Sequence, residues 1–146
     1  MSTDANVTAN LIKTLENGKL GFEKAAEKLE SDGRADIASS FRTFAAERAE
    51  MSEQLTLIAA AYGDQMDQRS SVPGALHRGW MAVKDAFTGD DPEAVINTAE
   101  QGEDHALEQY RDALAADISD ELRPVLSQQM ATVQRAHDYV RSLVKA

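Results

Sequence analysis

The chain has 146 residues and carries 15 Lys and Arg against 25 Asp and Glu, a formal net charge of -10. This length suits a single domain that can bury its own hydrophobic core. The chain contains no cysteine, which excludes thiolate chemistry, iron–sulfur clusters and zinc sites with cysteine ligands. The acidic balance and the lack of any run of basic residues predict that it has no nucleic-acid partner.

No apolar stretch approaches the ~20 residues that a membrane helix needs, and the first residues lack the basic and apolar regions of a signal peptide. We therefore expect a cytoplasmic protein that makes no membrane contact. The composition is 42% hydrophobic but only 5% aromatic. Such a composition, rich in alanine, leucine and glutamate, is typical of long helices rather than sheets.

The first two predicted helices cover residues 5–31 and 35–62, approximately. In both segments apolar or small residues recur at alternating intervals of four and three residues, which is the spacing of a helix with one buried face. The first helix ends at the turn signal Ser31-Asp32-Gly33. The buried face of the second helix contains one arginine, Arg48.

The connection that follows covers residues 63–91, and a short amphipathic helix is predicted within it at about 75–87. His77, Arg78 and Trp80 lie in this short helix. We expect Trp80 to anchor the connection on the rest of the protein.

The third and fourth predicted helices cover residues 92–117 and 120–145, approximately. The third begins at a proline that follows an aspartate, which is typical of a helix start. Ala99 and Ala106 widen its apolar face. This additional apolar surface is the feature of the sequence that points to a homodimer. The sequence specifies no other protein partner.

Four long helices, two short turns and one connection of ~28 residues match an all-α four-helix bundle with a single long crossover. Ferritin-like bundles are built in this way, with the first and fourth helices running one way and the second and third the other. The alternative is a simple up-and-down bundle with an excursion at one end. The hydrophobic periodicity alone does not separate the two.

Four ionisable residues lie on the predicted buried faces: Arg48, Glu100, Glu103 and His137. Such groups are costly to bury unless they are paired or bind a metal. A helix rises ~1.5 Å per residue. On this basis Glu103 and His137 fall at similar depth along the bundle in the long-crossover arrangement.

One hypothesis is a site for iron or another divalent metal. Its ligands would be Glu103 and His137, completed by carboxylates from Glu23, Glu47 or Glu50. A full di-iron centre of such a bundle needs a Glu-x-x-His pattern on two helices. The fourth helix instead has a glutamine before its histidine, and the second has no histidine. No other catalytic motif is present, so we do not expect an enzyme.

The alternative hypothesis is a non-catalytic structural or protein-interaction module. In this interpretation Arg48, Glu103 and His137 form a buried ion-pair cluster that fixes the register of the helices and binds no metal. Gly18 lies opposite Arg48, and its missing side chain would make room for the guanidinium.

Several short segments together resemble one protein family. They are Gly21-Phe22, Ala25-Ala26-Glu27, Glu47-Arg48, the segment from Gly74 to Trp80, Gly102-Glu103-Asp104 and Ala136-His137-Asp138. The chain resembles, over nearly its whole length, a ferritin-like domain-of-unknown-function family of small bacterial four-helix-bundle proteins. The resemblance implies the ferritin-like fold and an association with bacterial stress responses, and it implies no established reaction.

Overall fold

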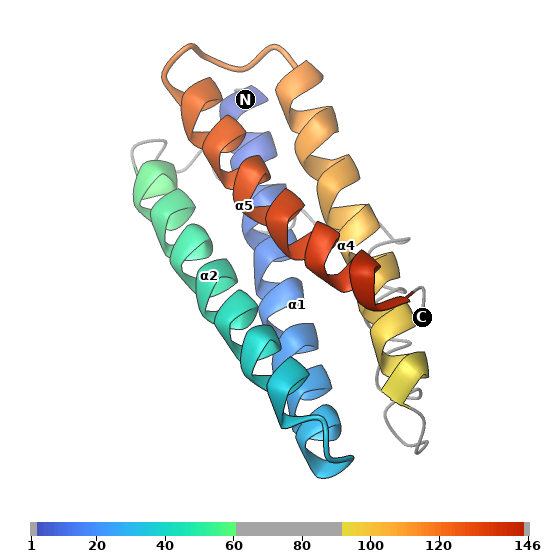
Figure 1. The fold of residues 1–146 in the computed structure, drawn as a ribbon. Helices are drawn as coiled ribbons and strands as arrows, with labels where there is room; N and C mark the ends of the chain where they lie inside the picture. Colours follow the sequence, from blue (N-terminus) through green and yellow to red (C-terminus); the bar gives the residue numbers. More distant parts are fainter. Residues whose placement is uncertain (1–2, 61–91, 145–146) are drawn as a thin grey trace.

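The computed structural model describes residues 3–60 and 92–144. These residues form four helices and no strand, so the predicted all-α class is confirmed, and the helices pack as a bundle (Figure 1). The helices are α1 (Thr3–Ser31), α2 (Ala35–Ala59), α4 (Pro92–Ala115) and α5 (Leu122–Val144). The predicted connection at 63–91 lies outside the described residues, together with its short helix, His77, Arg78 and Trp80.

A glycine-based cap ends α1 and begins the turn to α2. The N–H of Arg34 donates to the carbonyl of Leu29 at 2.8 Å, and the N–H of Gly33 donates to that of Glu30 at 3.1 Å. These two bonds satisfy carbonyls at the helix end that would otherwise lack partners. Gly33 has a φ of 84°, a left-handed conformation that glycine adopts without steric cost.

The turn between α4 and α5 is fixed by side chains. The N–H of Leu122 donates to Ser119 Oγ at 3.2 Å, so Ser119 caps the start of α5. The N–H of Ser119 in turn donates to Asp4 Oδ1 at 2.9 Å. Since Asp4 belongs to the first turn of α1, the beginning of α1 lies beside the α4–α5 turn.

These contacts define the directions of the helices. The beginning of α1 lies near the end of α4, so these two helices are antiparallel. Near the end of α2, Gln54 bonds Gln129 of early α5, so α2 and α5 are antiparallel as well. Consequently α2 and α4 run in the same direction (Figure 1), and the end of α2 and the beginning of α4 lie at opposite ends of the bundle. The long crossover itself stays a prediction.

The hydrophobic core is divided into two clusters along the bundle axis. One contains Phe22, Leu29, Phe41, Val95, Ile96 and Val140, among others. The other contains Leu11, Leu15, Leu55, Leu107, Tyr110 and Val133, among others. The buried residues between the two clusters are small or polar on three of these helices: Gly18 and Gly21 on α1, Arg48 on α2, and Gly102 and Glu103 on α4. The middle of the core is therefore a polar layer.

Candidate functional site

Arg48 and Glu103 form an ion pair at the centre of this polar layer. Arg48 Nη2 lies 2.5 Å from Glu103 Oε2, and the two side chains are only 1% and 0% exposed. The pair joins α2 to α4 across the bundle. The positions of these residues on the buried faces suggested such a contact, and the structure brings the two together.

The surroundings of Arg48 are shaped to hold a guanidinium. A Cβ at Gly18 would lie 2.9 Å from Arg48 Nη1, closer than non-bonded atoms pack. The guanidinium also lies over the ring of Phe22, with 5.2 Å between its central carbon and the ring centroid. An aromatic face attracts a cation at this distance.

The ion pair is incompletely satisfied. Arg48 Nη1 and Glu103 Oε1 are buried and have no hydrogen-bond partner among the described residues. Burial raises the pKa of Glu103 above 4.5, while the charge and hydrogen bond of Arg48 act in the opposite direction. Much of the attraction within the pair is thus offset by the cost of removing both charges from water.

His137 belongs to a second polar group, between α4 and α5 and nearer the surface. Its Nε2 lies 2.6 Å from Asp104 Oδ1 and its Nδ1 lies 3.5 Å from Asp138 Oδ1. Within the described residues, the hydrogen bonds of His137 go to these two carboxylates and not to Glu103. Hydrogen bonds from Gln134 and His137 lower the pKa of Asp138.

Glu100 completes this second group. One ligand atom each from Glu100, Asp104 and His137 can be chosen so that all three lie within 4.8 Å of one another. Two carboxylates and an imidazole at this separation are a donor set that a divalent metal ion can use. The same Glu100 carboxylate lies 3.4 Å from Nη1 of Arg141.

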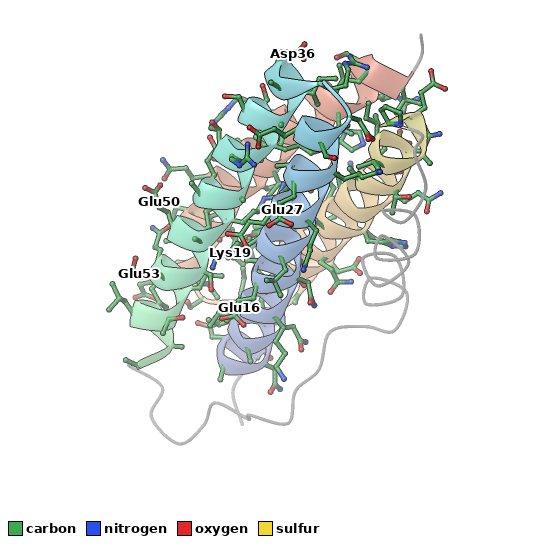
Figure 2. The ribbon with its side chains drawn as sticks, turned by 90° about the horizontal axis from the view of Figure 1, so that it is seen from below. Glu16, Lys19, Glu27, Asp36, Glu50 and Glu53 are labelled. Carbon is green, nitrogen blue, oxygen red and sulfur yellow. The ribbon has the colours of Figure 1, made fainter. Side chains whose placement is uncertain are left out.

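The remaining carboxylates of the predicted metal set lie elsewhere. Glu23 is exposed and lines a shallow depression between α1 and α2. Glu47 is half-buried, and Glu50 is exposed on α2 (Figure 2). None of the three belongs to the group around His137, so the predicted set of five stays a prediction and the structure offers a different donor set.

Asp104 is the residue of this group that sequence reasoning missed. It lies beside the buried face of α4 and is more than half exposed, so the apolar pattern did not select it. One signal was present in the sequence: Glu100 and Asp104 are four residues apart, and this spacing places two side chains on the same face of a helix.

Gln129 of α5 is a second polar residue of the core. The structure buries Gln129. Its Oε1 accepts a hydrogen bond from the Tyr110 hydroxyl at 2.8 Å, and its Nε2 donates to Gln54 Oε1 at 2.9 Å. This amide therefore joins α2, α4 and α5 through satisfied bonds, and burial raises the pKa of Tyr110.

His105 stands apart from both groups. It is half-buried on α4, and its Nδ1 lies 3.9 Å from Glu108 of the following turn. Because it lies two residues after Glu103, it faces a different side of the helix.

By fold and site, the described part of the chain is an all-α bundle of four helices with an ion pair in its core and a histidine–carboxylate group at the α4–α5 surface. It belongs to the family described as domain of unknown function (DUF2383), whose profile matches residues 5–116. This confirms the resemblance to a family of unknown function, whereas its ferritin-like and bacterial character stays a prediction. The matched region ends before His137.

No curated protein matches the chain, and no solved structure does so either. None of the helices formed by residues 3–60 and 92–144 has an apolar stretch that could span a bilayer.

Proposed function

We propose that this protein binds a divalent transition-metal ion between α4 and α5 through Glu100, Asp104 and His137. The observation that carries the proposal is the convergence of these three side chains from two helices, with ligand atoms within 4.8 Å of one another. The proposed role is metal binding or buffering, without a reaction. The cytoplasmic location and the stress association expected from the sequence stay predictions.

The chemistry of the donors favours a particular class of ion. Calcium and magnesium prefer sites made of oxygen ligands only, whereas an imidazole nitrogen suits zinc, iron and their neighbours in the first transition row. We therefore expect Zn²⁺ to bind more tightly than Mn²⁺, in keeping with the general order of affinities for mixed nitrogen and oxygen donors.

Binding requires a small rearrangement of the group. His137 Nε2 and Asp104 Oδ1 are 2.6 Å apart, whereas two ligands of one zinc ion, each about 2.0–2.2 Å from the metal, lie farther from each other. The Asp104 side chain is 55% exposed, whereas that of His137 is only 10% exposed, so the rearrangement falls to Asp104. Asp138, beside Nδ1, can orient the imidazole in the way that carboxylates orient metal-binding histidines.

Calorimetric titration of the metal-free protein with Zn²⁺ tests the proposal. We expect one ion per chain, together with a rise in melting temperature. The affinity should fall at least tenfold in His137→Ala and in Asp104→Asn. His105→Ala is the matched control, because it removes a histidine that lies outside the group, where it pairs with Glu108. Absence of binding, or equal losses in His105→Ala and His137→Ala, would contradict the proposal.

The structural role is a second candidate, and the buried Arg48–Glu103 pair favours it. The two roles do not compete for the same residues, because the ion pair and the histidine–carboxylate group share no side chain. A protein that failed to bind Zn²⁺ would retain this second role.

A further inference from the structure

Two acidic residues of α4 face two basic residues of α5 at the proposed metal site. Glu100 and Asp104 are one turn apart on α4, and His137 and Arg141 are one turn apart on α5. Across the interface, His137 pairs with Asp104, and Arg141 pairs with Glu100. Each carboxylate of the site thus has a partner on the opposite helix.

Arg141 is the member of this arrangement that a cation would displace. Its positive charge lies 3.4 Å from the Glu100 carboxylate that would bind the metal. A divalent ion beside this guanidinium would be repelled by it. The side chain of Arg141 is 68% exposed and can turn toward solvent, whereas that of Glu100 is 20% exposed.

We propose that Arg141 acts as an internal competitor for the metal: it occupies the Glu100 carboxylate in the metal-free protein and withdraws when the ion binds. This inference rests on the proposed function and adds what regulates the affinity of the site. Because an exposed ion pair is weak, Arg141 lowers the affinity moderately instead of closing the site.

The test is calorimetric titration with Zn²⁺ of the wild type, Arg141→Gln, Arg141→Lys and Arg135→Gln. We expect Arg141→Gln to bind Zn²⁺ about three- to tenfold more tightly than the wild type at low salt. Arg141→Lys keeps the charge and should stay close to the wild type. Arg135→Gln is the matched control, since this exposed α5 arginine bonds Thr132 and its loss changes the net charge equally.

Ionic strength provides a second readout. The advantage of Arg141→Gln should shrink between about 20 mM and about 500 mM salt, because salt screens the charge of an exposed side chain. Circular dichroism verifies that each variant is folded.

The outcomes separate this inference from the proposed function. If the wild type binds Zn²⁺ through His137 but Arg141→Gln binds no more tightly, the inference is overturned and the proposed function stands. An equal gain in Arg135→Gln overturns it too, because net charge would then explain the effect. If neither the wild type nor Arg141→Gln binds Zn²⁺, both proposals are overturned.

Discussion

Arg48 is a charged residue in the middle of an apolar core, and three neighbours accommodate it. Glu103 supplies the counter-charge at 2.5 Å, Phe22 lies under the guanidinium, and Gly18 leaves the space that a larger residue would fill. A buried pair of this kind adds little net stability, because desolvation offsets the attraction, but removing one partner alone leaves an unpaired charge.

Replacing Glu103 by leucine should therefore be costly. We expect Glu103→Leu to lower the free energy of unfolding by about 3–5 kcal/mol, because Arg48 stays charged and loses its acceptor. The double variant Arg48→Met/Glu103→Leu should regain most of this loss, as a matched apolar pair commonly does. Urea denaturation measures both, with Glu108→Leu as an exposed control on the same helix. A double variant no more stable than Glu103→Leu would argue against this account.

At the scale of the helices, short polar signals define where elements begin and end. Gly33 ends α1 with a left-handed residue, and Ser119 caps α5. Pro92 is the first residue of α4, a position where its missing N–H does no harm. Capping depends on residues that are close together in the chain, so helix ends of this kind leave a local signal in the sequence.

Gly33 allows the capping contribution to be measured. A Cβ at this position would meet no atom of the described residues within 4 Å, so Gly33→Ala tests backbone conformation without steric conflict. We expect a loss of about 1–2 kcal/mol in the free energy of unfolding, because alanine is disfavoured at positive φ. Gly33→Asn should lose less, since asparagine tolerates this conformation. Equal losses in the two variants would contradict the explanation.

For the whole molecule, the pKa of Glu103 makes stability depend on pH. Burial raises this pKa from its ordinary value of 4.5, so the folded protein keeps the proton to a higher pH than the unfolded chain does. The unfolded chain then releases its proton first, and stability falls as the pH rises from 4.5 through the raised pKa.

Glu103→Gln isolates this effect, because it keeps an acceptor oxygen for Arg48 but cannot ionise. Urea titrations give the free energy of unfolding of each protein at each pH. The value for the wild type minus the value for Glu103→Gln should decrease as the pH rises from about 4 to about 8. An increase over the same range would mean that the attraction of Arg48 outweighs the cost of burial.

The sequence by itself determined the all-α class and placed Arg48, Glu103 and His137 on buried faces. Hydrophobic periodicity is a local property, and it reports which face of each helix is buried. A small residue opposite Arg48 could also be read from the chain, because Gly18 and Arg48 are nearly equidistant from one short turn.

Only the tertiary structure decided how these polar residues are partnered. The sequence treated Arg48, Glu103 and His137 as one cluster, whereas the structure divides them between a core ion pair and a surface group with Glu100 and Asp104. Pairing across helices depends on the relative rotation and translation of elements far apart in the chain. Hydrophobic periodicity gives the buried face of each helix but not the relative translation of two helices, so an exposed partner such as Asp104 emerges only when the helices are packed together.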